Sequence, residues 1–592
     1  MTEAARIVPL TGLHHLAPVL AAWHHAEWGH LYPDDVWNHA IAVREFATMA
    51  DPGSRDQTWV AFDGDDRDGA ALLGSVSLLA TDDLAGFEHL TPWLASLFVT
   101  PTARGWGVAA ALVDEVLRTA RADGHDVVHL FTSGQQRYWA DRGWSVVAAV
   151  DTEGHPATVM ARSTHPRGAR RAVCSTWCSD PDHQGAYSHL RANGTPAHRE
   201  RLAQQILPGL WFAGEATSAA YPATMHGAWL SGERAADQVL ASSVLADPAA
   251  SRVAVIGAGL AGLAAARRLQ AEHRQVVVIE SKSVAGGRIV SDRSTGAALP
   301  LGGAWLHGDQ GHPLRDLVST VPEPWDRPAF FVAGIGRIGT DDTAAVTAAY
   351  EMLHRAFADA EPGVTVATVV ERTLADAALP PLVRDTVTAW ITAECEGLYG
   401  APLDEMPANG GYEPFELPGG DHLVTSDLGA LAEHLAAGLD VRFERRVGHL
   451  RADGPRWCVD DDLVVDAVIV TVPIGALAAG RIAFSPTLPD DVRRAVASIG
   501  SGPIAKVFAT FDTVWWPDDR PFRLAGSERI GTFVDMSATA GRPTLVGFAV
   551  GEHARAVEHL GEHELCRLVD RELAVLDRDD RLRYGCRRGI DD

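Results

Sequence analysis

Lysine is almost absent from this chain of 592 residues. Lys and Arg together number 51, yet only Lys282 and Lys506 are lysines. Most positions that need only a positive charge therefore carry arginine. A retained lysine marks a place for a compact amine that can lose its proton, which a guanidinium cannot supply. Chance retention is the alternative, so the surrounding residues must decide.

Cysteine is also scarce, and the six cysteines exclude a disulfide framework. Cys174 and Cys178 are the only close pair, but their spacing is not that of a CxxC motif, so we expect no metal site. No uncharged apolar run approaches the ~20 residues of a membrane span. The N-terminus lacks the pattern of a signal peptide. We expect a cytoplasmic protein that is not embedded in a membrane.

The net charge of −26 argues against nucleic acid as a partner, because binding to phosphate backbones needs a basic surface. An acidic field could instead concentrate cationic substrates such as polyamines. The same charge could also serve only to keep the surface soluble, and charge alone favours that simpler interpretation.

Residues 252–262, RVAVIGAGLAG, have the pattern of a dinucleotide site. A short apolar run, 253–256, predicts a buried parallel strand, and a helix is expected from residue 263. A second strand, 275–280, ends at Glu280, whose carboxylate can accept ribose hydroxyls. The glycines between strand and helix permit a tight turn and a close approach to a pyrophosphate. They are Gly257, Gly259 and Gly262.

Two further glycine-rich segments follow, Gly286-Gly287-Arg288 and residues 301–308, LGGAWLHG. At this spacing the chain resembles the flavin-containing amine oxidase superfamily, especially its polyamine oxidase branch. The resemblance implies FAD as cofactor, with the GGR arginine near the phosphates and flavin. It also implies that the second segment lines the substrate cavity, through Gly303, Trp305 and His307.

The resemblance continues downstream. Residues 443–447, FERRV, look like a strand whose valine, Val447, contacts the adenine, and 468–477 look like the returning strand and turn. The segment 502–508, GPIAKVF, matches the one that carries the active-site lysine of the family, so Lys506 falls where a lysine is needed. Lys282 is expected to be a surface charge.

The family's C-terminal part does not follow residue 507 but stands upstream, at 172–240. There the motifs WCSDP, GAYS, FAGE and YPATMHGAWLSGERAA resemble the end of the family's sequence. The resemblance implies an aromatic wall from Tyr187, a bond from Glu215 to the ribityl chain, and an amine bound between Tyr187 and Thr224. Further flavin contacts are implied for Trp177, Gly214 and Met225.

This order predicts a circular permutant, joined through a loop at 241–250. Intramolecular closure is favoured, and the alternative is two incomplete flavoproteins that exchange segments in a domain-swapped homodimer. Residues 164–171 are the expected linker to what precedes, and 251–592 hold the FAD-binding and substrate domains.

Residues 92–144 carry another pattern: a strand over 92–99, the loop Arg104-Gly-Trp-Gly107-Val-Ala109, a helix, and a strand over 127–131. This resembles the GNAT family of N-acetyltransferases, over residues 1–163. The resemblance implies acetyl-CoA as co-substrate, bound at the loop and helix N-terminus. The residues implied are Val99, Arg104, Gly105, Gly107, Val108 and Ala109.

The acid of the acetyltransferase is less clear. Where the family often has a tyrosine that protonates the leaving thiolate, this chain has Trp139, with Tyr138 beside it. Tyr138 is the candidate after a small shift. A module that binds acyl-CoA without catalysis is the alternative.

The predicted fold class is thus a multidomain α/β protein, with a GNAT domain, a Rossmann-type FAD-binding domain and an α+β substrate domain. The predicted function is bifunctional: acetylation of a di- or polyamine, and oxidation of an amine or N-acetylated polyamine by O2 with release of peroxide. His307, with Glu413 or Glu416, is a candidate for holding a second amine. The alternatives are an oxidase with a non-catalytic N-terminal module and a tailoring oxidase for amino-acid-like amines.

Overall fold

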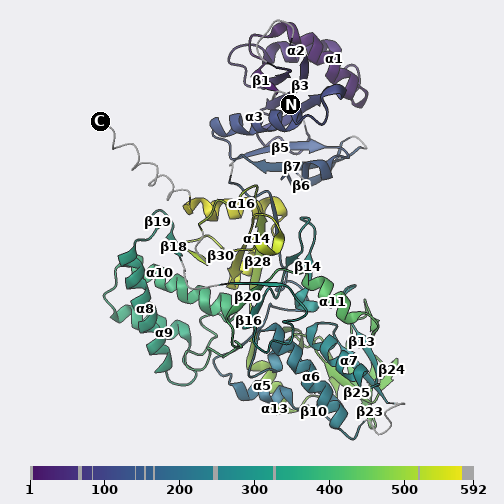
Figure 1. Ribbon diagram of the computed structural model, residues 1–592, viewed down its shortest axis with the longest axis vertical. Coiled ribbons are helices and arrows are strands. Elements are labelled where there is room, and N and C mark those ends of the chain that lie inside the picture. The colour runs from purple at the N-terminus through teal and green to yellow at the C-terminus, as the bar shows by residue number, and fades with distance from the viewer. Residues whose placement is uncertain are drawn as a thin grey trace. The chain divides into compact units, whose positions relative to one another are not determined.

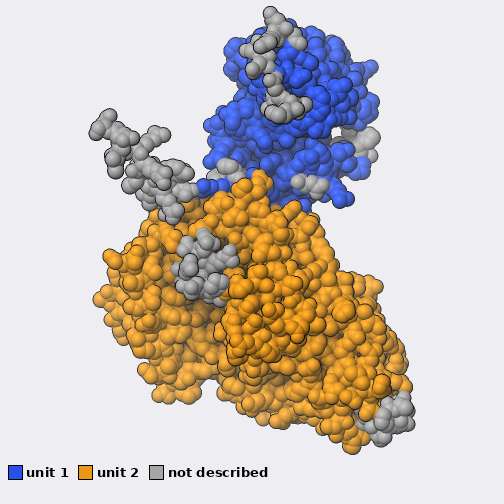
Figure 2. Space-filling model, in the orientation of Figure 1, with its two compact units in different colours: residues 1–171, 561–567 blue, residues 172–560, 568–592 orange. Residues whose placement is uncertain are grey.

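The computed structural model describes residues 5–64, 70–82, 84–140, 142–152, 155–164, 167–244, 251–323, 329–517 and 521–576. The chain forms two compact units (Figures 1 and 2). The first consists of residues 1–171 and 561–567, and the second of 172–560 and 568–592. Six residues of the predicted joining loop, 245–250, lie outside the described residues, as does the segment 577–592.

The first unit is built on a seven-stranded sheet in the order β1-β2-β3-β4-β5-β7-β6. Among the described residues of this sheet, the one parallel pair is β4 with β5, which meet at a single register position, Trp93 with His129. Helix α3 packs its apolar side, including Leu112 and Val116, into the core. The elements are β1 (Arg6–Pro9), α1 (Ala17–Trp28), α2 (His39–Met49), β2 (Gln57–Phe62), β3 (Leu72–Leu79), β4 (Trp93–Val99), α3 (Val108–Ala122), β5 (Val127–Thr132), α4 (Gln136–Ala140), β6 (Ser145–Thr152) and β7 (His155–Ser163).

The second unit contains a six-stranded sheet that interleaves distant parts of the chain. Its order is β10 (Gln205–Leu207), β11 (Leu210–Phe212), β25 (Ala467–Val470), β12 (Arg252–Ile256), β13 (Gln275–Ile279) and β21 (Asp440–Arg442). All pairs are parallel except β10 with β11. Strand β25 therefore stands between a strand from 172–240 and the first strand of the dinucleotide motif.

The two faces of this sheet are buried differently. Val253 and Val255 of β12 pack into the core beneath helices α6 (Met225–Ala241), α7 (Leu260–Ala271) and α11 (Leu428–Ala436). Ala254 and Ile256 face the opposite core. That core is formed with a smaller sheet, β22 (His449–Asp453), β23 (Arg456–Val459), β24 (Leu463–Val465) and β26 (Ala483–Ser485), and with α13 (Asp490–Ala497). Burial on both faces explains the continuous apolar sequence of these strands.

Helices α6 and α7 lie side by side (Figure 1). A Cβ placed on Gly232 of α6 would stand 2.1 Å from the carbonyl oxygen of Ala261 in α7, so only glycine permits this approach. The segment 172–240 is thereby packed tightly against the dinucleotide motif of the same unit.

A second sheet of this unit has the order β19-β18-β29-β30-β31-β28-β8. The strands are β8 (Arg171–Cys174), β18 (Ala329–Val332), β19 (Gly336–Arg337), β28 (Ile504–Thr510), β29 (Phe522–Ala525), β30 (Thr532–Asp535) and β31 (Thr544–Val550). A helical group packs nearby around its own apolar core, with α8 (Thr340–Ala358), α9 (Val366–Asp376), α10 (Pro381–Thr392) and the π-helical turn η6 (Ala393–Leu398).

The remaining strands and α-helices of the described residues are mostly short. They are β9 (Ser188–Leu190), α5 (Pro196–Ala203), β14 (Ser291–Asp292), β15 (Leu299–Pro300), β16 (Trp305–His307), β17 (Thr320–Pro322), β20 (Asp421–Val424), α12 (Ile474–Ala478), β27 (Ile499–Ser501), α14 (Ser537–Ala540), α15 (Gly551–Val557) and α16 (Glu562–Leu573).

The predicted mixed α/β fold is confirmed, and the strand–loop–helix–strand order at 252–279 is as expected. One expected strand is absent from this part of the chain. Strand β21 ends at Arg442, and residues 443–447 form an irregular segment in which Glu444 has a positive φ of 56°. The backbone instead turns back on the second nucleotide strand, because the N–H of Arg445 donates to the carbonyl of Glu280.

Candidate active site

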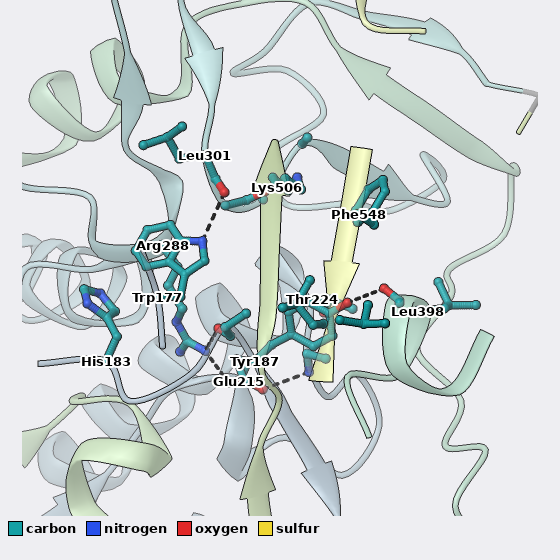
Figure 3. Close-up of a pocket in the computed structure, with 18 of the residues that line it drawn as sticks. Trp177, His183, Tyr187, Glu215, Thr224, Arg288, Leu301, Leu398, Lys506 and Phe548 are labelled. Atoms are coloured by element: carbon teal, nitrogen blue, oxygen red, sulfur yellow. Dashed lines mark hydrogen bonds and ion pairs between the residues drawn. The ribbon is translucent and has the colours of Figure 1, made fainter. Parts of the chain in front are cut away.

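A cavity of about 1110 Å³ lies within the second unit. It runs from the glycine loop after β12 to the second sheet, where Lys506 stands on β28. Figure 3 shows the part around Lys506, Tyr187 and Glu215. Of the residues predicted for the flavin and amine site, all line this cavity except Gly262 and Glu413. The structure therefore brings together residues that stand more than 300 positions apart in the sequence.

Gly262 does not line the cavity, but it allows α7 to pack closely against the glycine loop that does. A Cβ at this position would lie 2.0 Å from the carbonyl oxygen of Gly257, so any side chain would push α7 away from the loop. Gly257 itself has a φ of +107°, which favours glycine. The first turn of α7 presents N–H groups without helical partners, beside Gly259, and such a turn binds phosphate.

Glu280 follows the second nucleotide strand and is buried. One carboxylate oxygen accepts a hydrogen bond from the N–H of Ala258 at 2.7 Å, and the other accepts from the N–H of Lys282 at 2.8 Å. The carboxylate thus fixes the loop and borders the cavity. Lys282 is more than a free surface charge, because its Nζ lies 2.8 Å from Asp180 and 3.2 Å from Asp182.

The GGR segment approaches the same loop. Gly286 has a φ of +123° and forms a bridge with Gly259, so the two glycine loops lie in contact. Arg288 donates from Nη1 to Glu215 at 2.7 Å and to the carbonyl of Ala186 at 2.8 Å. A guanidinium of the segment that follows the glycine loop is therefore held at the cavity wall by two residues of the segment 172–240.

Glu215 is buried at the centre of this network (Figure 3). It accepts from the Ser188 hydroxyl at 2.5 Å and from the N–H of Ala223 at 2.9 Å. Burial alone would raise the pKa of its carboxyl, but the guanidiniums of Arg288 and Arg199 outweigh burial and lower it. Glu215 is therefore an ionised acceptor.

The N-terminus of α6 borders the cavity at Thr224 and Met225. The Thr224 hydroxyl caps this helix by accepting from the N–H of Gly227 at 2.9 Å. Met225 packs on Gly303, where a Cβ would stand 2.8 Å from its sulfur. Nearby, Gly214 has a φ of +120° and donates to the Ser231 hydroxyl.

Lys506 is buried, with its Nζ 4.7 Å from the centroid of the Trp305 ring. The amine donates to the carbonyl of Gly302. Burial lowers the pKa of Lys506 to about 7, because the ammonium loses its hydration. The side chain can therefore exist as a neutral amine near neutral pH.

Tyr187 lines the cavity with its ring, and its hydroxyl donates to the carbonyl of Gly397 at 2.6 Å. Gly397 belongs to the π-helical turn η6, a feature that often marks functional sites. Burial raises the pKa of Tyr187, so the phenol stays protonated. Trp177 donates from its indole to the carbonyl of Leu301 at 3.1 Å (Figure 3).

The candidates for holding a second amine separate into two groups. His307 stands on β16 with its Nδ1 3.0 Å from Asp421, and both line the cavity together with Glu416. Glu413 does not line it, because both of its oxygens accept from the buried Arg199, at 2.8 and 2.7 Å. Glu413 is thus a structural partner of an arginine.

Sequence reasoning missed several lining residues. The turn η6 carries Glu394, which accepts from the Tyr350 hydroxyl at 2.7 Å and contacts His354 at 3.0 Å. Arg523 and Thr532 line the cavity from the second sheet. No motif marks these positions: strand pairing brings Arg523 and Thr532 to the site, and the turn η6 brings Glu394.

The predicted acetyl-CoA loop lies in the first unit. Arg104 donates from Nε to the carbonyl of Val99 at 3.2 Å. Gly105 and Gly107 have φ values of +88° and +85°, and Gly107 is the N-cap of α3. Val108 and Ala109 form the first turn of this helix, whose N–H groups lack helical partners.

Tyr138 and Trp139 stand on the short helix α4. Trp139 is buried in the core, against the edge of Trp144. Tyr138 is half-buried, with the guanidinium of Arg142 3.6 Å from its ring centroid. The position that aligns with the family's tyrosine therefore holds a packing residue, and its neighbour carries the only hydroxyl of the pair.

Three family models match this chain. Residues 159–240 and 390–588 match the flavin containing amine oxidoreductase family, and 255–321 match an NAD(P)-binding Rossmann-like domain. Residues 18–143 match the GNAT acetyltransferase family. The protein is thus an enzyme that joins a flavin-containing amine oxidase to an N-terminal GNAT domain.

Among its relatives are polyamine oxidases. Polyamine oxidase 4 of Oryza sativa subsp. japonica is 29% identical over 54% of this chain and 71% of its own length. Polyamine oxidase 2 of Arabidopsis thaliana is 27% identical, over 52% of this chain and 69% of its own. A solved putrescine oxidase bound to putrescine is 22% identical with a TM-score of 0.45, over 55% of this chain and 81% of that one.

None of the helices in the described part of the chain combines the length and the apolar composition needed to span a bilayer.

Proposed function

We propose that the second unit oxidises an amine with FAD and O2, and that the first unit acetylates an amine with acetyl-CoA. The observation that carries the oxidase proposal is one cavity with a phosphate-binding glycine loop at one end and a buried lysine, Lys506, at the other. The proposal would make the enzyme bifunctional.

The residues fit FAD. The close contact between Gly262 and Gly257 leaves the helix N-terminus free to meet a pyrophosphate, and Glu280 offers a carboxylate for ribose hydroxyls. Arg288 and Glu215 would hold the cofactor on the opposite wall, and FAD, when bound, supplies the hydride acceptor and the reaction with O2 that forms peroxide. Val447 lines the same cavity and is the candidate contact for the adenine.

The chain's own side chains would bind and orient the amine. Tyr187 and Thr224 would flank it, since both line the cavity, and a site that excludes water favours the neutral amine over the ammonium. Neutral Lys506 can hold a water molecule or accept a proton beside the reacting carbon.

Acidic residues support a cationic substrate. Carboxylates line the cavity, and the chain's net charge of −26 would raise the local concentration of cations. Di- and polyamines are therefore the substrate class we propose. Besides Asp182, Glu215 and Glu280, the lining acids are Glu371, Asp385, Glu394, Glu416 and Asp421.

Anaerobic reduction tests the oxidase. The purified chain should absorb in the flavin bands, and addition of a di- or polyamine without O2 should bleach them. Admission of O2 should restore the colour and release one peroxide per amine oxidised. A chain that binds flavin but is bleached by no amine in a panel of mono-, di- and polyamines and amino acids would contradict the proposal. Reduction by amino acids alone would favour the tailoring oxidase.

The acetyltransferase is tested separately. Arg104→Ala should weaken acetyl-CoA binding and lower amine acetylation while leaving peroxide formation unchanged. If the wild-type chain binds acetyl-CoA but acetylates no amine, the first unit is a binding module and the bifunctional proposal fails.

The proposal includes a circular permutation of the oxidase. Support comes from β25, which stands between β11 and β12, and from the close packing of α6 on α7. Intramolecular closure predicts a flavin-loaded monomer by light scattering at low concentration. Flavin retained only in a dimer would favour a segment exchange between two chains.

A further inference from the structure

Four cavity-lining residues form one row across four adjacent strands. Lys506 of β28 stands opposite Phe548 of β31, and Phe548 stands opposite Thr532 of β30. Thr532 in turn stands opposite Arg523 of β29. Residues directly opposite each other in antiparallel strands project from the same face of the sheet. The row therefore points into the cavity from Lys506 at one end to Arg523 at the other.

Two polar atoms at the far end of this row lack partners. The Nε of Arg523 and the hydroxyl of Thr532 are buried, and neither has a hydrogen-bond partner among the described residues. A buried polar group without a partner costs about 1–3 kcal/mol, so such groups usually meet a ligand or a water. Here two of them stand side by side in the wall of a large cavity, and both can donate.

The neighbours of Arg523 do not neutralise it directly. The carboxylate of Glu394 is occupied by the Tyr350 hydroxyl and by His354. The guanidinium lies 5.5 Å from the ring centroid of Trp390, whose ring stacks on Tyr350 with centroids 4.0 Å apart. Arg523 is thus positioned over an aromatic wall, with its Nε left free for a ligand.

We propose that Arg523 and Thr532 bind the carbonyl oxygen of an acyl group on the amine substrate. The inference rests on the proposed amine oxidation, because the reacting carbon would stand at the other end of the row, beside Lys506. Two converging donors suit one acceptor oxygen. An acyl amide supplies that oxygen without a charge.

The charges around the subsite select among ligands. The guanidinium of Arg523 would repel the second ammonium of a free diamine. A carboxylate would meet Glu371, Asp385 and Glu394, which line the same cavity and carry its own sign. A neutral carbonyl avoids both repulsions, so an N-acylated amine fits better than a free diamine or an amino acid.

The row also sets a minimum length for the substrate. Neighbouring strands lie about 4.8 Å apart, so three spacings separate the backbones of Lys506 and Arg523 by roughly 14 Å. A substrate that reaches both ends therefore needs a chain of several atoms between its reacting amine and its acyl group. Short acylated amines should not gain from the subsite.

The test compares substrates and variants by anaerobic flavin reduction. The probes are mono-N-acetyl-1,4-diaminobutane, 1,4-diaminobutane and 4-aminobutanoate, together with mono-N-acetyl diamines of two and six methylenes. We expect the wild-type chain to bind an acetylated diamine at least ten times more tightly than the free diamine, with the two-methylene compound weakest. Arg523→Met should weaken binding of the acetylated diamine about 10- to 100-fold, the range for a lost hydrogen bond to a charged group. The limiting rate of reduction should change less than threefold, and the free diamine should bind at least as tightly as before, because the guanidinium that repels its second ammonium is gone.

Thr532→Val keeps the side chain's shape and removes only the hydroxyl, so it tests the subsite even if Arg523→Met loses flavin. Its expected effect is about three- to tenfold on the acetylated diamine alone. Arg384→Met is the matched control, since Arg384 is an exposed arginine at the same cavity but outside the row. It should leave the preference for acetylated over free diamine unchanged.

The outcomes separate the two proposals. If no amine bleaches the flavin, amine oxidation itself fails and the subsite falls with it. If free diamines are oxidised with no gain from acetylation, or if both row variants weaken all substrates equally, amine oxidation stands and the carbonyl subsite is wrong. Tightest binding of 4-aminobutanoate would also overturn it, in favour of a carboxylate site.

Discussion

Each unit places a glycine-containing loop in front of a helix N-terminus, yet the glycines meet different needs. In the second unit, Gly262 is required by packing, because a Cβ would stand 2.0 Å from the carbonyl of Gly257. In the first unit, Gly107 has open space around it, with no atom within 4 Å of a Cβ, but its φ is +85°. One loop is fixed by contact and the other by backbone conformation.

The two loops also differ in the charge beside them. The loop before α7 has a carboxylate next to it, Glu280, which accepts from the N–H of Ala258. The loop before α3 has a cation, Arg104, which donates to the strand that leads into it. Both helix ends suit a phosphate, but only the first also offers an acceptor for sugar hydroxyls. A helix N-terminus thus predicts an anion, and its neighbours decide which molecule carries that anion.

Gly262→Ala should have the largest effect. Its Cβ would also lie 3.0 Å from the Thr471 hydroxyl, so α7 must shift and the pyrophosphate site is lost. We expect flavin content to fall at least tenfold and stability to drop by about 1–3 kcal/mol or more. Flavin absorbance relative to protein, with thermal melting, measures both.

Gly296→Ala is the control for that change, because Gly296 has a φ of +82° but no atom near its Cβ. It should cost only about 1 kcal/mol and keep its flavin. Full flavin occupancy in Gly262→Ala would show that the contact is not what fixes the loop.

The two units also differ in the burial of the side chain proposed to transfer a proton. Lys506 of the second unit is buried, and Tyr138 of the first is half-buried. Lys506→Met should lower peroxide-forming turnover about 1000-fold, within the range for loss of an acid–base group. Because burial lowers the pKa of Lys506 to about 7, the neutral amine is present above that pH and lost below it. Wild-type turnover should therefore rise through pH 7, and the variant's residual turnover should lack this rise. A variant that keeps the same rise would assign it to another group.

Tyr138→Phe should lower acetyl transfer about 100-fold with no change in melting temperature, because the hydroxyl is lost and the ring is kept. Trp139→Phe should lower the melting temperature and leave acetyl transfer by the folded protein unchanged, since Trp139 is in the core. Acetylation assays and thermal melting of both variants distinguish these roles. If Tyr138→Phe retains full activity, Tyr138 is not the acid.

The smallest effect is expected for Gly107→Ala, which strains the backbone by about 1–2 kcal/mol without a clash. Acetyl-CoA binding should weaken a few-fold by calorimetry. Gly124→Ala provides the matched control, because Gly124 has a φ of +88°, equal open space, and a position past the far end of the same helix. It should cost similar stability and leave acetyl-CoA binding intact. Equal weakening by both would indicate a general loss of fold.

Much of the fold was predictable because its signals are local. The strand, glycine and helix order at 252–279 depends on neighbours within a few residues of each other. Glu413 shows the limit: it looked available to a substrate, but it pairs with Arg199, 214 positions away in sequence. No spacing rule reports such a partner.

Strand register was equally out of reach. The row from Lys506 to Arg523 exists because four strands pair with one particular alignment, and a shift by one residue would turn each side chain to the other face. The expected strand at 443–447 failed for a related reason. Its apolar and charged residues suit a strand. The chain nevertheless leaves the sheet after Arg442, and the N–H of Arg445 donates to the backbone carbonyl of Glu280.

The place of β11 beside β25 has a consequence for synthesis. Strand β11 pairs with β10, which precedes it, and with β25, which leaves the ribosome roughly 250 residues later. At about 5–20 residues per second, the edge of β11 that faces β25 stays unpaired for on the order of tens of seconds. The apolar face of α6 must wait as well, though more briefly, for α7. The nascent chain therefore carries an incomplete six-stranded sheet for much of its translation. We expect chaperones to bind it most in that interval.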